Sequence, residues 1–384
     1  MTANGAPRAA LRERGAIVHD WFQGYHGAER VADVMRCGVF EPDAPPDIYT
    51  FEAAKELLPP ELARAIVRES RIANLPGIRQ RGHDPGRWRY LLPYMPYYYR
   101  RLDLDQYEIV ISSAHACAHH VRPRADATHV VYCYTPMRYA WLPETDERRL
   151  TGIRGAALRA LTRHLRRLDA QAARRPHAYA AISTAVQERI RRFYGRESTV
   201  IHPPVDVDDF AVTRDKDDGW FLWVHRLVPY KHPLTVAEAF RGLPYRLTMV
   251  GVGPLEQELR ASLPPNVTLL GWVSREALAR LYAKASGFIH VGEEDFGMTM
   301  VEAMASGTPV IALNRGGSRD IVRDGVDGML VAEPDLGLVR AAVEHLAGRP
   351  WDADGLARRA AEFSRERFVA RMLAFVHAAR DGTV

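Results

Sequence analysis

The stretch GEEDFGMTMVEAMASG, residues 292–307, decides how the rest of the chain is interpreted. An apolar segment at 287–291 precedes it, and ValIleAlaLeu at 310–313 follows it. This order predicts a strand, a glycine-containing turn, a short helix over 298–306 and a second strand. A strand–turn–helix–strand unit is typical of a parallel sheet covered by helices.

Two carboxylates and a helix start fall within this stretch. Glu302 lies one turn inside the expected helix, and because Cβ bonds tilt towards a helix N-terminus, its side chain should lean back over the Gly297 turn. Glu294 precedes that turn, and the free amides of Gly297, Met298 and Thr299 should point into the same space with the positive end of the dipole. Carboxylates accept hydrogen bonds from hydroxyls, and unpaired backbone amides bind phosphate. A ligand with both groups is a nucleotide sugar. An exposed acidic loop before a buried helix is the alternative.

The motif around these residues resembles a known family. The spacing Glu294-x7-Glu302, with Phe296-Gly297 and the tail EAMAxGxPV that begins at Glu302, is similar to family 4 of the retaining glycosyltransferases. The resemblance implies an α/β protein of the GT-B fold, two Rossmann-like domains facing across a cleft. It also implies transfer of a hexose from a nucleotide diphosphate sugar, with retention at the anomeric carbon, to a glycan, lipid-linked or small-molecule acceptor.

Size and composition agree with two globular domains. The chain has 384 residues, of which 47% are hydrophobic and 26% charged, as in ordinary globular proteins. No apolar run approaches the ~20 residues that cross a bilayer. Residues 1–15 lack the apolar core of a secretory signal, so we expect a disordered leader. The three cysteines (Cys37, Cys117 and Cys133) are odd in number and widely spaced, which favours a reducing compartment, hence the cytoplasm.

The net charge of +5 is unevenly distributed. Residues 154–175 form a concentrated basic segment, predicted to be a helix, that could meet anionic lipid or only water. No nucleic-acid-binding signature accompanies it, so nucleic acid is excluded as a partner. The segment 88–101 mixes aromatic residues with arginines, which suits a membrane or acceptor interface, although packing on the N-terminal sheet explains it equally well. Peripheral docking on the inner face of the plasma membrane therefore stays open.

The first domain is expected over 16–203. A strand at 16–20 leads into a loop with two glycines, followed by a helix from Arg30 to Gly38. In the family this loop carries two adjacent glycines near the donor phosphates. The matching pair here is Gly27-Ala28, and because Ala28 tolerates positive φ poorly, only Gly27 is assigned to the donor. A plain βα turn is an equally good interpretation.

Polar residues end the next predicted strand, 107–113. Ser112, Ser113 and His115 lie at its carboxyl end, where ligands bind in open parallel sheets. The resemblance places His115 close to the transferred sugar, with a structural histidine as the alternative; His119 and His120 receive no role.

A second aromatic segment follows the strand predicted at 128–134. YCYTPMRYAW, ending at residue 141, resembles a subgroup of bacterial mannosyltransferases that make surface polysaccharides. The resemblance places Arg138 and Tyr139 on the acceptor side, with Arg138 towards an anionic phosphate. A structural arginine is an equal alternative.

The remaining pattern alternates strands and helices. The C-terminal domain is expected over 204–364, and an amphipathic helix over 365–384 should cross back onto the N-terminal domain. Further predicted strands are 48–51, 178–183, 220–225, 246–250 and 267–270; further predicted helices are 61–68, 184–194, 275–284, 335–347 and 353–363.

Arg226 and Lys231 supply the other half of the expected chemistry. Their R-x4-K spacing just past strand 220–225 resembles the family's diphosphate clamp, and two cations there would stabilise the charge of a departing nucleoside diphosphate. The resemblance implies that the loop at Trp272-Val273 binds the base of the donor and that Glu302 binds its ribose. It also implies that residues of the opening motif bind the donor sugar, namely Glu294, Phe296, Gly297 and Met298.

The expected mechanism needs no metal and no cofactor. The Asp-x-Asp pairs at 103/105 and 206/208 do not end an apolar strand, and no carboxylate pair suggests a double-displacement nucleophile. The resemblance favours front-face attack, with GDP-mannose as donor. A nucleotide-sugar epimerase and a non-catalytic nucleotide-sugar-binding subunit are the alternatives. A nicotinamide dehydrogenase is least favoured, because no G-x-G-x-x-G follows an early strand.

Overall fold

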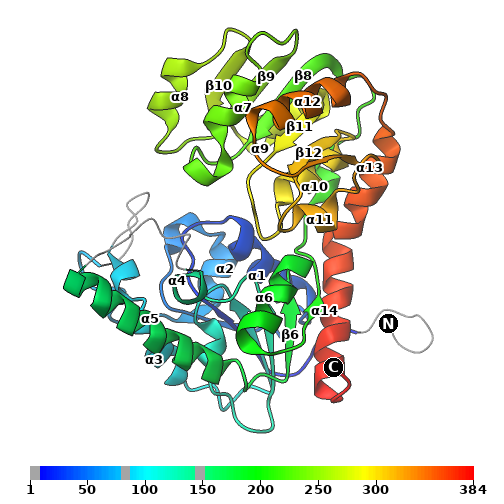
Figure 1. Ribbon diagram of the computed structural model, residues 1–384. Helices are drawn as coiled ribbons and strands as arrows, with labels where there is room; N and C mark the ends of the chain where they lie inside the picture. The colour runs from blue at the N-terminus through cyan, green and yellow to red at the C-terminus, as the bar shows by residue number, and fades with distance from the viewer. Residues whose placement is uncertain (1–8, 79–86, 143–151) are drawn as a thin grey trace. The chain divides into compact units, whose positions relative to one another are not determined.

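The computed structural model describes residues 9–78, 87–142 and 152–384. The chain divides into two compact units, coloured along the sequence in Figure 1. The N-terminal domain comprises Met1–His202 with Phe368–Val384, and the C-terminal domain comprises Pro203–Arg367. Each is built on one parallel sheet with helices packed on it, so the predicted fold class of two Rossmann-like domains is confirmed.

The N-terminal sheet has seven parallel strands in the order β3-β2-β1-β4-β5-β6-β7. Its central strands are buried along their whole length, as expected when helices cover both faces of a parallel sheet. In the β1–β4 pairing, His19 lies opposite Ser113. The strands are β1 Gly15–His19, β2 Asp47–Thr50, β3 Ile66–Arg68, β4 Ile109–Ala114, β5 Thr128–Cys133, β6 Ala178–Ala181 and β7 Thr199–Val200.

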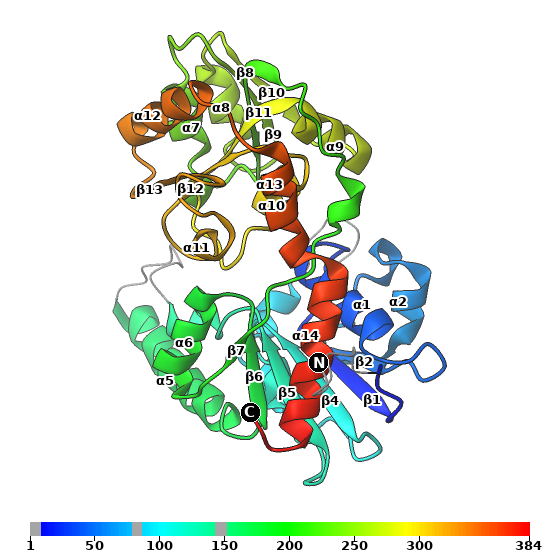
Figure 2. The same cartoon turned by 90° about the vertical axis from the view of Figure 1, so that its right-hand side faces the viewer.

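Helices of this domain connect the strands, and the last one returns from the other end of the chain (Figure 2). Ser183 caps α6, because its hydroxyl accepts the Val186 amide at 3.2 Å, as the sequence predicted. The Phe368 ring of α14 packs edge-on against Tyr132, with ring centroids 5.5 Å apart. The helices are α1 Gly27–Gly38, α2 Pro60–Ala65, α3 Met95–Arg100, α4 Arg138–Trp141, α5 Gly152–Ala172, α6 Thr184–Tyr194 and α14 Arg365–Arg380.

Two expectations for the N-terminal domain are wrong. The helix predicted over 61–68 ends at Ala65, because Ile66–Arg68 pairs with β2 as the edge strand and buries Ile66. The disordered leader cannot extend to residue 15, because Leu11 is buried and its amide donates to the Val39 carbonyl at 2.9 Å. The first eight residues of that expected leader lie outside the described part of the chain.

The aromatic segment at 88–101 divides into packed and exposed parts. It forms a 3₁₀ turn, Trp88–Leu91, followed by α3. Trp88 and Tyr99 are fully buried, whereas Tyr90 is 76% exposed. Packing on the N-terminal domain is therefore confirmed for Trp88 and Tyr99, and an interface role for the exposed part of the segment stays a prediction.

The C-terminal sheet has six parallel strands in the order β10-β9-β8-β11-β12-β13. Aromatic and aliphatic side chains from these strands and their helices make one continuous core, with the Phe221 and Phe240 ring centroids 5.5 Å apart. The strands are β8 Asp217–Val224, β9 Arg246–Val250, β10 Val267–Gly271, β11 Ala285–His290, β12 Val310–Leu313 and β13 Gly328–Val331. The helices are α7 Pro233–Ala239, α8 Glu256–Ser262, α9 Arg275–Lys284, α10 Met298–Ala305, α11 Ser318–Ile321, α12 Leu336–Ala347 and α13 Ala353–Ala360.

The carboxyl ends of β8, β9 and β10 are tied together by backbone hydrogen bonds. The His225 amide donates to the Val250 carbonyl at 3.1 Å, and the Gly251 amide donates to the Gly271 carbonyl at 2.8 Å. Gly251 has φ 141°, and a Cβ there would lie 1.8 Å from the His225 carbonyl oxygen. Only glycine fits this position, so the loops that follow these strands start from a rigid base. Over the described part of the chain, every helix is too short or too polar to span a bilayer.

Candidate active site

Lys231 and Glu294 form an ion pair at the carboxyl edge of the C-terminal sheet. Lys231 lies in the 3₁₀ turn after β8, and its buried Nζ donates to Glu294 Oε1. Glu294 lies in the loop after β11, with its side chain 32% exposed. The structure thus brings together two of the predicted catalytic residues, and it leaves part of the carboxylate open to a ligand.

Two buried histidines lie behind this pair, and neither is among the predicted site residues. His225 Nδ1 lies 3.8 Å from Glu294 Oε1, and His290 Nε2 lies 4.0 Å from Oε2. Burial, with His290 and Lys231 as further causes, holds the pKa of His225 well below its ordinary value. Burial lowers the pKa of His290 to about 4, against an opposing effect of Glu294. Both rings are therefore neutral near pH 7. Their position at the carboxyl ends of β8 and β11 is the signal that could have found them.

The start of α10 has the geometry that the sequence predicted. Gly297 precedes the helix with φ 103°, and a Cβ there would lie 2.4 Å from Met300 Cε, so a side chain cannot replace it without displacing Met300. The Thr299 hydroxyl lies 3.3 Å from His290 Nδ1, which links the helix start to the histidines. Phe296 is buried, and Met298 is half-buried. The first amides of the eight-residue helix therefore form a fixed row of donors.

Glu302 is buried one turn into α10. The Tyr282 hydroxyl of α9 donates to its Oε2 at 3.2 Å. The pKa of Tyr282 is raised well above its ordinary value by burial first, then by Glu302 and, among further causes, by Glu294. Of the two predicted carboxylates, Glu302 is therefore the one that the Tyr282 hydroxyl holds directly.

Other predicted donor residues lie at the same sheet edge without joining this cluster. Arg226, two residues past β8, is exposed, and its guanidinium makes no ion pair with any residue that the structure describes. Trp272 follows β10 and is 77% exposed, and Val273 is half-buried. Among the described residues, these three side chains form no hydrogen bond or ion pair with Lys231 or Glu294.

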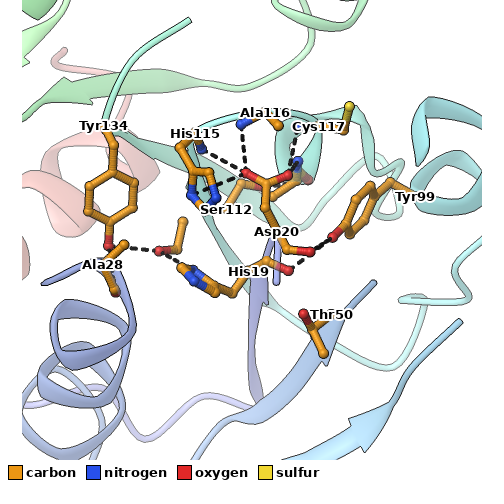
Figure 3. Close-up of polar contacts among 12 residues, drawn as sticks. His19, Asp20, Ala28, Thr50, Tyr99, Ser112, His115, Ala116, Cys117 and Tyr134 are labelled. Carbon is orange, nitrogen blue, oxygen red and sulfur yellow. Dashed lines mark hydrogen bonds and ion pairs between the residues drawn. The ribbon is translucent and has the colours of Figure 1, made fainter. Parts of the chain in front are cut away.

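The N-terminal domain carries its own polar cluster at the carboxyl edge of its sheet (Figure 3). His19 Nδ1 lies 2.9 Å from Ser113 Oγ, which lies 3.0 Å from the Tyr134 hydroxyl. Tyr134 in turn donates to the Ala28 carbonyl at 3.0 Å. Burial, helped by His115, holds the pKa of His19 well below its ordinary value. This chain of hydrogen bonds ties β1, β4 and β5 to the first turn of α1.

His115 directly follows β4, where the sequence placed it. Its ring packs edge-on against Trp21, with ring centroids 4.3 Å apart, and 20% of its side chain is exposed. The structure places Gly27 differently from the expectation: it is the first residue of α1, which begins three residues before Arg30. Neither Gly27 nor Ala28 has a positive φ. The tolerance of positive φ that distinguished Gly27 from Ala28 is therefore not needed here, because both residues are helical.

The two predicted acceptor-side residues lie on α4. Arg138 and Tyr139 are its first residues and are exposed. α4 follows β5, so both residues also lie beyond the carboxyl end of a strand.

Among the described residues, one cluster has the composition of a metal site. His119, His120 and Asp169 are buried, with the two Nε2 atoms 3.1 and 2.9 Å from Asp169 Oδ1. Trp141 and Tyr194 donate to Oδ2 at 2.6 and 2.8 Å. These four neighbours already surround the carboxylate, and buried His120 Nδ1 lacks the second hydrogen bond usual for a metal-ligating histidine. Asp169 is better explained as a hub that joins α5 to α4 and α6.

The two domains and their carboxyl-edge residues define a protein of the GT-B fold class. The Anabaena protein HepE, crystallised with UDP and glucose, shares this fold with a TM-score of 0.65 at 18% identity, covering 94% of this chain and 99% of that one. Sucrose-phosphate synthase from Thermosynechococcus elongatus has a TM-score of 0.69 at 17% identity, covering 95% and 98%.

Family models match both halves of the chain. Residues 17–209 match the model described as Glycosyltransferase Family 4, and residues 205–365 match the model described as Glycosyl transferases group 1. The chain belongs to glycosyltransferase family 4.

Curated relatives match over a shorter region. A D-inositol 3-phosphate glycosyltransferase of Mycobacterium sp. (strain KMS) is 34% identical over 187 residues, 38% of this chain and 42% of the relative. One from Mycobacterium bovis is 33% identical over 205 residues, 46% of this chain and 42% of the relative. The match spans about two fifths of the length of these curated relatives.

Proposed function

We propose that the protein is a retaining glycosyltransferase that moves a hexose from a nucleotide diphosphate sugar to a hydroxyl of an acceptor. The observation that carries the proposal is the Lys231–Glu294 pair beside the start of α10. A nucleotide sugar has a diphosphate directly attached to a ring bearing hydroxyls. An ammonium adjacent to a carboxylate matches both parts at once, since the cation suits phosphate and the carboxylate suits hydroxyls.

In this proposal each group of the C-terminal domain has one task. Lys231 and exposed Arg226 bind the diphosphate, and the amides of Met298 and Thr299 add donors with the helix dipole behind them. Glu294 accepts hydrogen bonds from the sugar, and Glu302, oriented by Tyr282, accepts them from the ribose. The loop at Trp272 and Val273 contacts the base.

The reaction is proposed to proceed on one face of the sugar. The acceptor oxygen forms a bond to the anomeric carbon as the bond from that carbon to the diphosphate oxygen breaks. A non-bridging oxygen of the leaving phosphate takes the acceptor's proton. Arg226 and Lys231 stabilise the negative charge that accumulates on the diphosphate, so they act more strongly in the transition state than in the ground state. We propose that no metal ion takes part.

The donor and acceptor are finer parts of the proposal. HepE of Anabaena was also crystallised with UDP-glucose, whereas the motif YCYTPMRYAW favours GDP-mannose by resemblance. The named relatives act as D-inositol 3-phosphate glycosyltransferases. We propose mannose as the transferred hexose and a glycan or lipid-linked acceptor that Arg138 and Tyr139 contact.

We also propose that α3 and α5 dock on anionic lipid at the inner face of the plasma membrane. The Tyr97 hydroxyl lies 2.8 Å from His164 Nε2, so the two helices lie side by side. Tyr90, which precedes α3, and Arg163 and Arg167 of α5 are exposed. Binding to anionic vesicles should fall steeply as salt rises; salt-independent binding would contradict the proposal.

A donor screen tests the function. Each nucleotide sugar of a panel with UDP, GDP and ADP donors is added to the full chain while thermal unfolding is followed, because a ligand that binds the fold raises its apparent stability. The stabilising donor is then incubated with acceptor alcohols, and NMR gives the anomeric configuration of the product. We expect stabilisation by one base class and a retained anomer.

Two results would redirect this conclusion. Conversion of the donor to a different sugar without acceptor would identify the epimerase alternative, and stabilisation without turnover on any acceptor would identify a binding subunit. A sugar trapped covalently on an enzyme carboxylate would contradict the front-face mechanism.

A further inference from the structure

The carboxylate of Asp20 lies inside a ring of four consecutive backbone amides (Figure 3). Oδ2 accepts hydrogen bonds from the amides of His115 and Ala116, both at 2.7 Å. Oδ1 accepts them from Cys117 at 2.6 Å and from Ala118 at 2.8 Å. Asp20 is fully buried. Charge-assisted hydrogen bonds of this length are the strong kind, so one side chain fixes the whole turn that follows β4.

The main chain of Asp20 is itself held in place. The Tyr99 hydroxyl lies 3.0 Å from the His19 carbonyl and 2.7 Å from the Asp20 carbonyl. Pairing of β1 with β4 sets His19 opposite Ser113. The carboxylate therefore starts from a rigid strand end, and the turn it grips cannot shift independently of the sheet.

The same carboxylate faces the ring of His115. Nδ1 of His115 lies 3.7 Å from Asp20 Oδ2 and is buried, and Trp21 packs against the ring edge-on. A negative charge beside Nδ1 favours the tautomer with the proton on Nδ1. Nε2 then carries the lone pair, which can accept a hydrogen bond from a hydroxyl.

We propose that Asp20 is a positioning residue for His115: it holds the turn that carries His115 and sets the ring tautomer, so that Nε2 accepts a hydrogen bond from a hydroxyl of the bound sugar or acceptor. This inference rests on the proposed function for the identity of the hydroxyl. The tautomer and the hold on the turn do not depend on it.

The proposal is tested first on the unmodified full chain. Long-range ¹H–¹⁵N NMR of its histidine side chains should show His115 with the proton on Nδ1. A proton on Nε2 would overturn the proposal without any variant having to fold.

The variant Asp20→Asn then removes two of the four acceptor contacts, because its amide nitrogen meets amide donors. Hydrogen exchange of the amides at 115–118 should accelerate by about 10- to 100-fold, the usual effect of losing a hydrogen bond to a charged group. The His115 ring should shift towards the other tautomer. With the proposed donor, kcat should fall at least about tenfold while the donor KM changes by less than about threefold.

Asp169→Asn is the matched control. It alters an equally buried carboxylate of the same domain that faces His119 and His120 instead of His115. Its His115 tautomer should match the unmodified chain. If Asp20→Asn leaves both the tautomer and the exchange unchanged, the positioning role is refuted. If both change as expected and no sugar is transferred by the unmodified chain, the positioning role stands and the proposed function fails.

Discussion

Asp20 in the N-terminal domain and Glu294 in the C-terminal domain both follow a strand at the carboxyl edge of a parallel sheet, but their surroundings differ. Asp20 is fully buried and is satisfied by four backbone amides. Glu294 is one third exposed and pairs with a lysine side chain. The backbone amides around Asp20 are fixed by the fold and cannot turn towards a ligand. A lysine side chain can keep its contact with Glu294 and also interact with a charged ligand.

These different surroundings suit the two domains to different tasks. In the N-terminal domain, hydrogen bonds to Asp20 and along the chain from His19 to Tyr134 hold the scaffold, and the His115 side chain beside them is 20% exposed. In the C-terminal domain, buried Lys231 pairs with partly exposed Glu294, and Arg226 is exposed; we propose that these side chains bind the donor themselves. Under the proposed function, the N-terminal cluster positions a side chain and the C-terminal cluster supplies charge.

The largest expected effect is loss of the lysine. Lys231→Met removes the cation but keeps the side-chain length, so kcat should fall by about 100- to 1000-fold, as when one preorganised group that stabilises developing charge is lost. Lys284→Met, at an exposed lysine paired with Asp215, is the control and should leave kcat unchanged. An unchanged kcat for Lys231→Met would contradict the proposal that Lys231 stabilises the charge of the leaving diphosphate.

A smaller effect is expected at Glu302. Glu302→Ala should weaken binding of the nucleotide by about 10- to 100-fold, the usual effect of losing hydrogen bonds to a charged group. Glu302→Gln keeps an oxygen for the Tyr282 hydroxyl and should lose less. Calorimetric titration of the nucleoside diphosphate measures both. Equal affinities for Glu302→Ala and the unmodified chain would show that this carboxylate belongs to the scaffold, like Asp20.

How much of this could be predicted depends on how far apart in the sequence the interacting groups are. The helix predicted over 298–306 and the Ser183 cap follow from local patterns, and the structure has the cap and a helix over Met298–Ala305, one residue shorter than predicted. Asp20 could not be recognised, because its partners lie 95 to 98 residues away and are backbone amides with no sequence signature. The edge strand at Ile66–Arg68 was missed because only the neighbouring strand reveals it.

The C-terminal site was easier to predict than the N-terminal one for the same reason. Glu294 and Glu302 lie on one strand–turn–helix unit, and Lys231 follows the neighbouring strand in the sheet. His225 and His290 were missed although they end strands, since a buried histidine is seen to face a carboxylate only once the strands are paired.

A modest effect of pH on stability follows from the buried His290. Its pKa is about 4 in the folded domain and about 6.5 in an unfolded chain. Between these values the unfolded chain binds a proton that the fold does not, so the free energy of unfolding falls as pH drops from 6.5 to 4, by up to roughly 3 kcal/mol for this group. Thermal unfolding from pH 7.5 to 4.5 should show His290→Asn losing less stability than the unmodified chain. Parallel curves would contradict the neutral buried ring.

The smallest effect is expected from metal removal. If Arg226 and Lys231 supply the charge that a metal would otherwise provide, EDTA should change the rate of sugar transfer by less than about twofold. Transfer is measured before and after EDTA treatment, with added Mg²⁺ as the control. Abolition by EDTA and recovery with Mg²⁺ would mean that side-chain cations do not suffice in the C-terminal domain.

The most direct test of the central claim is calorimetric titration of UDP and GDP, each separately, into the unmodified full chain and into the double variant Arg226→Ala/Lys231→Ala. The account predicts that one of the two nucleotides binds the unmodified chain and that the double variant binds it at least about 100-fold more weakly. Equal affinity of both proteins for that nucleotide, or no binding of either nucleotide to the unmodified chain, would contradict the claim that these cations hold a sugar donor by its leaving group.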